Sequence, residues 1–91
     1  MSERRVRVRV TGSVQGVFFR EATRREAERL GLSGWVRNCF DGRVEAEFQG
    51  TSRAVERVIE FCHRGPASAN VDDVDVMELD SVPGDEDFTI R

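Results

Sequence analysis

The sequence predicts an α+β fold in which two helices cover one face of an antiparallel or mixed β-sheet. Three observations lead to this prediction. A stretch near the N-terminus alternates valine with arginine, two later stretches carry apolar residues at helical spacing, and an Asp-Gly pair separates two strand-like segments. With 91 residues, the chain is expected to form a single domain over residues 1–91.

The first strand and the first helix are predicted in the N-terminal third. Residues 5–11 place valines on one face and arginines on the other, which is typical of a half-buried strand. Residues 12–16 interrupt this alternation and predict a loop. From Phe19 to about Gly31, apolar residues recur among charged helix formers, which predicts a short amphipathic helix that Gly31 ends.

Two strands joined by a tight turn are predicted next. Residues 34–40 form the second strand, and Asp41-Gly42 is a strong hairpin signal. Residues 43–49 alternate apolar with charged or polar side chains, so the third strand is expected to turn one face inward. Thr51 or Ser52 is then placed to cap the second helix.

The second helix is predicted from an apolar stripe at positions i, i+3, i+4 and i+7. This stripe consists of Val55, Val58, Ile59 and Cys62. The Gly65-Pro66 pair ends the helix.

The C-terminal segment has a less regular pattern. Val74 and Val76 share one face of a strand, whereas Met77 and Leu79 have the opposite parity. A bulge or a bend would reconcile these positions. Residues 88–91 predict a short closing strand.

This order of elements, β-α-β-β-α-β plus a short C-terminal strand, is the ferredoxin-like or split β-α-β arrangement. Right-handed crossovers make the first and second strands parallel, with the third strand between them. The loop after the first strand and the end of the second strand then lie at the same edge. Residues 12–20 are therefore expected near Asn38.

The charge pattern restricts the function classes. The net charge is −3, and every basic residue is an arginine, for which adaptation to high salt and a GC-rich genome are both possible reasons. Glutamates interleave the arginines of residues 20–29, which favours a solvated face over a nucleic-acid surface. No apolar run approaches the ~20 residues of a membrane span. Residues 1–5 lack the apolar stretch of a secretory signal, so a cytoplasmic protein is expected.

The two cysteines indicate neither a disulfide framework nor a metal site. Cys39 and Cys62 are far apart and form no C-x-x-C pair. His63 adjoins Cys62, but two neighbouring ligands do not make a zinc site. Cys62 is expected in the core, with His63 on the flank of the helix.

Residues 13–20 join a strand to a helix N-terminus, where unpaired N–H groups and the helix dipole favour an anion. Gly16 can adopt a positive φ and so help successive amides to curl around the anion. Arg20 can add a forked, charge-assisted hydrogen bond to two phosphate oxygens. The alternative is an ordinary strand–helix connection with a surface arginine. The segment is not a Walker loop, because the GK[ST] ending is missing.

Asn38 also has two interpretations. An asparagine just before an Asp-Gly pair is commonly a turn former. At the edge that carries the anion loop, its carboxamide is also suited to orient a water molecule.

Two longer motifs resemble the signatures of the acylphosphatase family. Residues 12–20, GSVQGVFFR, resemble its GxVQGVxFR signature, and residues 34–45, GWVRNCFDGRVE, resemble its GWVRNxxDGxVE signature. Further similarities are Gly50, the Gly65-Pro66 pair and the terminal Phe88-x-Ile90-Arg91, so the resemblance extends over essentially the whole chain.

This resemblance implies hydrolysis of acyl phosphates to a carboxylate and inorganic phosphate, without a metal or another cofactor. Arg20 and Asn38 are the implied catalytic residues, with Asn38 positioning the attacking water. The implied phosphate-binding loop consists of Ser13, Val14, Gln15, Gly16, Val17, Phe18, Phe19 and Arg20. If the last strand lies beside the site, the α-carboxylate of Arg91 is also placed to pair with Arg20.

A ferredoxin-like regulatory or RNA-binding module without catalysis is the alternative. An RNA reader presents exposed aromatic rings and a basic sheet face, whereas this chain lacks tyrosine and has a negative net charge. Acylphosphatase-like domains also occur within larger carbamoyl-transferring maturation proteins. A free-standing monomer acting on a small-molecule acyl phosphate, without nucleic-acid or membrane partners, is expected. The resemblance does not distinguish which acyl phosphate is the substrate.

Overall fold

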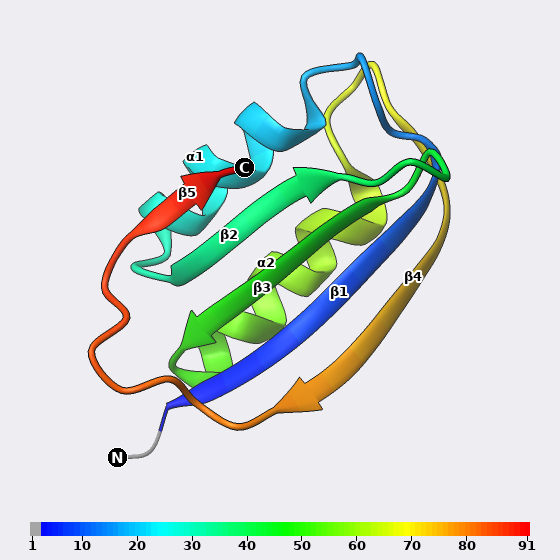
Figure 1. The fold of residues 1–91 in the computed structure, drawn as a ribbon. Helices are drawn as coiled ribbons and strands as arrows, with labels where there is room; N and C mark the ends of the chain where they lie inside the picture. Colours follow the sequence, from blue (N-terminus) through cyan, green and yellow to red (C-terminus); the bar gives the residue numbers. More distant parts are fainter. Residues whose placement is uncertain (1–2) are drawn as a thin grey trace.

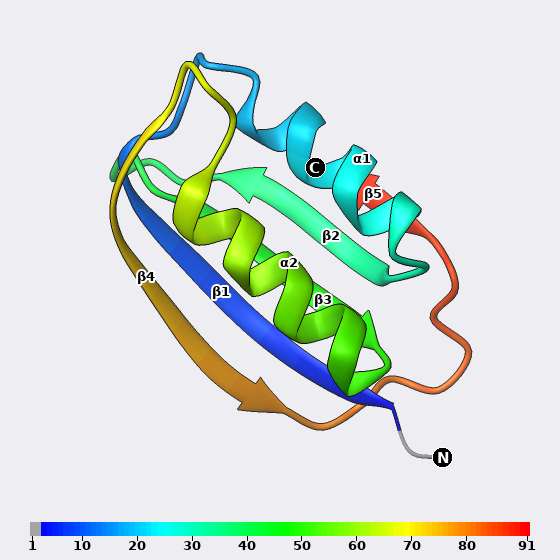
Figure 2. The ribbon, with the colours of Figure 1, turned by 180° about the vertical axis from the view of Figure 1, so that it is seen from behind.

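The chain folds into a five-stranded sheet with two helices on one face (Figures 1 and 2). A computed structural model describes residues 3–91, so Met1 and Ser2 of the N-terminal segment considered above lie outside the described residues. The elements are β1 (Arg4–Ser13), α1 (Phe19–Arg29), β2 (Ser33–Asn38), β3 (Val44–Gly50), α2 (Ser52–Arg64), β4 (Asn70–Leu79) and β5 (Phe88–Ile90).

The strand order is β4-β1-β3-β2-β5, which confirms the predicted ferredoxin-like α+β fold. Because β1 and β2 both pair with β3 in antiparallel fashion, they run in the same direction with β3 between them. The short β5 pairs with β2 in parallel and makes the sheet mixed. The end of β2 and the loop after β1 therefore meet at one end of the sheet, as predicted (Figure 1).

The core lies between the helices and the sheet. The three valines of β1 are almost fully buried, as are Phe48 of β3 and the predicted stripe of α2 except for the partly buried Ile59. Phe19 of α1 packs against Phe61 of α2, with 6.2 Å between the ring centroids. Cys62 belongs to this core, as predicted, and burial raises the pKa of its thiol to about 12.

Two strands end at residues other than those predicted. β1 continues through Gly12 to Ser13, because a register shift between Thr11 and Gly12 lets it keep pairing with β4. A Cβ atom at Gly12 would lie 2.2 Å from the Asn70 carbonyl oxygen, so this close approach of two backbones requires glycine. β2 ends at Asn38 rather than at Phe40, because the chain enters the hairpin turn there.

No irregularity separates Val76 from Met77 in β4. Val76 pairs with the buried Val8 and Met77 pairs with Arg7, in one continuous register. The predicted bulge or bend is therefore wrong at this point, and the observed register shift lies earlier in β4, between Val71 and Asp73, opposite Gly12. An edge strand tolerates this pattern because its side chains on both faces are partly exposed.

The two helices begin in different ways. Thr51, one of the two predicted caps, accepts a hydrogen bond from the Ala54 N–H at its Oγ1 atom (3.2 Å). The residue before α1 is Phe18, which adopts a left-handed conformation and whose side chain does not cap the helix.

No helix within residues 3–91 is long and apolar enough to cross a membrane.

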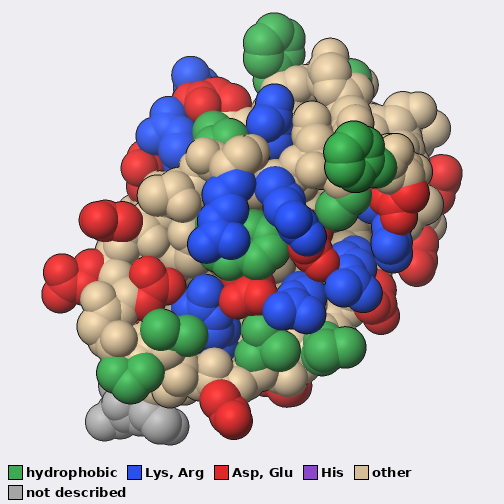
Figure 3. Space-filling model, in the orientation of Figure 1, with side chains coloured by type: hydrophobic (Ala, Val, Ile, Leu, Met, Phe, Trp, Pro, Cys, Tyr) green, Lys and Arg blue, Asp and Glu red, His purple; other side chains and the backbone are tan. Residues whose placement is uncertain are grey.

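The sheet face opposite the helices carries a network of arginines and glutamates (Figure 3). Glu47 bridges Arg5 and Arg7, with nitrogen–oxygen distances of 2.9 and 2.8 Å. Glu45 bridges Arg9 and Arg37 in the same way, at 2.8 and 2.6 Å.

Burial raises the pKa of Glu45, but the hydrogen bonds from Arg9 and Arg37 outweigh it, so this pKa lies below its ordinary value. On the same face, Trp35 is only 9% exposed. The guanidinium carbons of Arg37 and Arg91 lie 5.5 and 4.5 Å from the centroid of its ring.

Candidate active site

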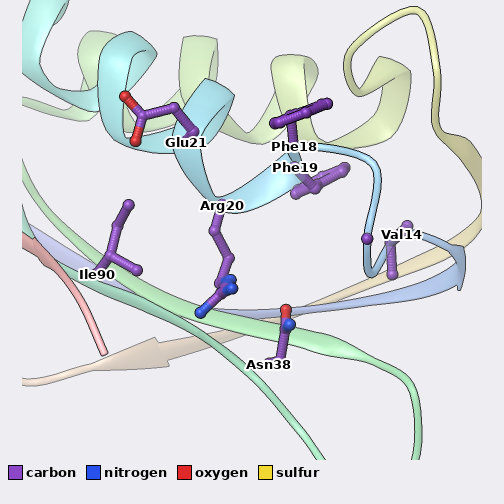
Figure 4. Close-up of a pocket in the computed structure, with 8 residues that line it drawn as sticks. Val14, Phe18, Phe19, Arg20, Glu21, Asn38 and Ile90 are labelled. Carbon is purple, nitrogen blue, oxygen red and sulfur yellow. The ribbon is translucent and has the colours of Figure 1, made fainter.

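A cavity of 330 Å³ lies where the loop after β1 meets the end of β2 (Figure 4). Ligand pockets measure roughly 300–1,000 Å³, so this volume suits a small molecule. Its walls combine apolar side chains with a few polar groups that converge on one space. They are formed by Val14, Gly16, Phe18, Phe19, Arg20, Glu21, Asn38 and Ile90.

Arg20 and Asn38 point into this cavity from opposite walls (Figure 4). Arg20 lies in the first turn of α1, and Asn38 is the last residue of β2, where it pairs with Val44 of β3. Within residues 3–91 the Asn38 carboxamide makes no hydrogen bond, so both its donor and its acceptor are available to a ligand in the cavity. The structure thus brings together the two residues that the sequence places 18 positions apart (38 − 20).

The loop between β1 and α1 bends through two left-handed residues. Gly16 has a φ of 73° and Phe18 a φ of 63°. Such bends turn neighbouring N–H groups toward one side, which makes an anion-binding concavity. No side chain caps the first turn of α1, so its unpaired N–H groups and the helix dipole add to the attraction for an anion.

Gln15 ties this loop to the β2–β3 hairpin. Its Nε2 atom donates to the Cys39 carbonyl oxygen (2.7 Å) and to the Arg43 carbonyl oxygen (2.9 Å). On the other side, Ser68 Oγ donates to the Val17 carbonyl oxygen (2.8 Å). The loop is therefore held both to the strand that carries Asn38 and to the segment after α2.

Three residues of the predicted loop do not line the cavity. Ser13 remains in β1 and pairs with Asn70, Gln15 makes the hairpin contacts just described, and Val17 packs partly against the core. The side chains of these three residues therefore affect the site only through the shape of the loop. The other five predicted loop residues all line the cavity.

Glu21 and Ile90 also line the cavity, although the sequence did not indicate them. Glu21 follows Arg20 in α1, and a hydrogen bond from Arg24 lowers its pKa below the ordinary value, so this carboxylate is ionised at neutral pH. Ile90 reaches the site because β5 lies beside β2. Its pairing partner is 54 residues away in the sequence (90 − 36), and no local signal reveals such a contact.

The last residue of the chain lies beside Arg20. The Arg20 Nη1 atom donates to the main-chain oxygen of Arg91 over 3.4 Å. The predicted proximity is therefore observed, whereas pairing with the charge of the α-carboxylate stays a prediction. Within residues 3–91, no group of three or more His, Cys, Asp or Glu side chains has an arrangement suited to a metal ion.

Comparison with known proteins shows the family of this chain. A sequence model of the acylphosphatase family matches residues 6–90. An acylphosphatase from Rubrobacter xylanophilus is 54% identical over 97% of this chain and 80% of its own length. One from Haloarcula marismortui is 48% identical over 100% of this chain and 99% of its own.

Among solved structures, the acylphosphatase from Bacillus subtilis superimposes with a TM-score of 0.92 at 38% identity. That match covers 97% of this chain and 98% of the Bacillus chain. The family model, the sequence relatives and the shared fold together show that the chain belongs to the acylphosphatase family.

Proposed function

We propose that this protein hydrolyses acyl phosphates to a carboxylate and inorganic phosphate at the cavity that Arg20 and Asn38 line. The observation that carries this proposal is their convergence. A guanidinium, a free carboxamide and an uncapped helix N-terminus face one small cavity, in a chain of the acylphosphatase family.

The phosphate group of the substrate binds at the N-terminus of α1. The N–H groups of the loop from Ser13 to Arg20 donate to its oxygens, and the Arg20 guanidinium adds a forked ion pair. These donors are fixed by the fold before the substrate arrives, so they stabilise the charge of the transition state without reorganising. Phosphoryl transfer depends mainly on such positioning and electrostatic stabilisation.

Asn38 holds the attacking water on the sheet side of the phosphate. Its carboxamide orients the water without changing its charge. The water oxygen forms a bond to phosphorus while the bond from phosphorus to the acyl oxygen breaks, and the bonding electrons leave with the carboxylate. A phosphate oxygen of the substrate accepts the proton of the water.

The leaving group explains why so few residues suffice. The carboxylate that departs is the base of an acid with a pKa of about 4, comparable to Asp or Glu. Protonating it in the transition state would gain little, so a general acid is not required.

The proposed enzyme acts as a monomer in the cytoplasm through one domain over residues 1–91.

The binding-module alternative has less support. RNA-reading sheets of this kind present exposed aromatic rings on their central strands. On the open face, β1 and β3 carry arginines and glutamates that pair with each other. The aromatic residue of that face, Trp35, is largely covered by Arg37 and Arg91. We therefore propose no nucleic-acid partner.

The first test is hydrolysis of benzoyl phosphate in the presence of EDTA, by the wild type and by the variants Arg20→Ala and Asn38→Ala. Each variant is expected to lose about 10²–10³-fold in kcat, the effect of removing one donor that stabilises a transition state. Arg29→Ala is the matched control, because Arg29 lies at the opposite end of α1 and pairs with Glu26. Wild-type protein that is folded but inactive refutes the proposal.

A further inference from the structure

Phe18 combines two features that are unfavourable for a phenylalanine. It is the one residue other than glycine with a positive φ among residues 3–91, and a bulky side chain is strained in that conformation. Its ring is also 81% exposed to solvent. Glycine or asparagine would adopt this backbone more easily, and a polar side chain would be better solvated.

The Phe18 ring has no structural role in the fold. The Phe18 side chain forms no cap on α1 and is not part of the hydrophobic core, whereas its neighbour Phe19 is buried there. Phe18 instead lines the cavity, together with Arg20 and Glu21. An exposed aromatic ring at the mouth of a binding site is suited to contact a ligand.

The position of the ring relative to Asn38 indicates which part of the ligand it meets. This step rests on the proposed function. In an in-line displacement the leaving group departs on the side of phosphorus opposite to the attacking water. Figure 4 shows Asn38 on the sheet wall of the cavity and Phe18 and Glu21 on the α1 wall. With water held at Asn38, the acyl group therefore points toward Phe18 and Glu21.

We propose that Phe18 binds the acyl group of the substrate, so that the enzyme favours acyl phosphates with a flat, apolar acyl group. An aromatic acyl group stacks on the Phe18 ring in an offset or edge-to-face arrangement. Ile90 supplies a second apolar surface at the same cavity.

Glu21 disfavours a second negative charge on the acyl group. Glu21 lines the cavity, while its ion-pair partners Arg24 and Arg25 lie on α1 and are not part of the wall. An acyl group with its own carboxylate thus meets a like charge. The preferred class of substrate is uncharged and apolar.

Phe40 offers a matched comparison. Its side chain is exposed, like that of Phe18, but it lies in the β2–β3 hairpin. It lines a separate hollow with Gln15, Asn38 and Cys39 rather than the cavity that contains Arg20. Removing its ring deletes as much exposed aromatic surface next to Asn38 without touching the α1 wall.

The test measures kcat and KM for benzoyl, acetyl and succinyl phosphate with the wild type, Phe18→Asn, Phe18→Tyr, Glu21→Gln and Phe40→Ala. Asparagine tolerates the left-handed conformation, so Phe18→Asn is expected to fold. It should lower the benzoyl-to-acetyl ratio of kcat/KM about fivefold, equivalent to about 1 kcal/mol. The change should appear mainly in KM, because the contact exists before and during the reaction.

Phe18→Tyr should keep the wild-type ratio, and so should Phe40→Ala. Glu21→Gln should raise the succinyl-to-acetyl ratio about twofold, as expected for one screened charge. An unchanged benzoyl-to-acetyl ratio in folded Phe18→Asn overturns the inference, as does an equal loss of that ratio in Phe40→Ala. Folded wild type that hydrolyses none of the three substrates instead refutes the proposed function.

Discussion

Gln15 connects the two segments that form the cavity, so Gln15→Met is expected to slow hydrolysis more than it weakens phosphate binding. Methionine keeps a similar length but cannot donate to the carbonyl oxygens of Cys39 and Arg43. The loop then loses its fixed distance to the hairpin, and with it to Asn38. The anion-binding N–H groups of α1 are retained.

The size of the effect follows from the contacts that remain. The Cys39 carbonyl oxygen still accepts from the Gly42 N–H (3.2 Å), and the Arg43 carbonyl oxygen still accepts from the Cys39 N–H (2.8 Å). Neither carbonyl is left without a partner, so each lost bond costs about 1 kcal/mol and the pair about 2 kcal/mol. In a domain of this size Tm should fall by roughly 8–16 °C. A displacement of about 1 Å between water and phosphate should lower kcat by up to ~100-fold.

The assay compares kcat for benzoyl phosphate with the inhibition constant of inorganic phosphate, at a temperature where the protein is folded. Gln49→Met is the control, because Gln49 exchanges two hydrogen bonds with Val82 (2.9 and 2.7 Å) away from the cavity. It should lower Tm without lowering kcat. A wild-type kcat in Gln15→Met, or an equal loss of kcat and phosphate affinity, would refute the reasoning.

Three further predictions concern stability and the C-terminus. Because the pKa of Glu45 is lowered in the fold, its stabilising effect is present above the ordinary value of 4.5 and is lost as the pH falls through the lowered pKa. Glu45→Gln should therefore reduce the free energy of unfolding at neutral pH and make it decline less steeply below pH 4.5. Urea titration at several pH values measures this, and parallel curves of unfolding free energy against pH for the wild type and the variant would contradict it. Thr51→Ala should cost about 1 kcal/mol and Ser52→Ala much less, as seen by thermal unfolding, since only the first removes the cap of α2. Deleting Arg91 removes the main-chain oxygen that Arg20 contacts and the hydrogen bond from the Arg91 N–H to the Val36 carbonyl oxygen (2.8 Å). The kcat/KM for benzoyl phosphate should therefore fall. An unchanged kcat/KM would show that Arg20 needs no such partner.

The sequence alone predicted those parts of the fold that local patterns determine. The alternating valines of β1 and the apolar stripe of α2 appear as buried faces. Short crossovers then restricted the topology enough to bring residues 12–20 near Asn38. This is why Arg20 and Asn38 could be expected at the same end of the sheet, where both line one cavity.

The remaining features depend on contacts between distant residues. β2 ends at Asn38 because Cys39 and Arg43 close the hairpin there, although Cys39 and Phe40 look like strand residues. Met77 can lie on the face of β4 opposite to Val76 because β4 is an edge strand, and the position of a strand within a sheet is not visible in the local pattern. Ile90 entered the site through the parallel pairing of β5 with β2, which no periodicity encodes.

The contact of Trp35 with Arg91 gives the protein a natural optical probe. Trp35 is the sole tryptophan and the chain has no tyrosine, so its intrinsic fluorescence comes almost entirely from this one indole. The Arg91 guanidinium lies over that ring, and the main-chain oxygen of the same residue accepts from Arg20. Emission from Trp35 therefore reports on whether the C-terminal strand is docked against β2. A chemist can follow the assembly of one wall of the cavity with unlabelled protein.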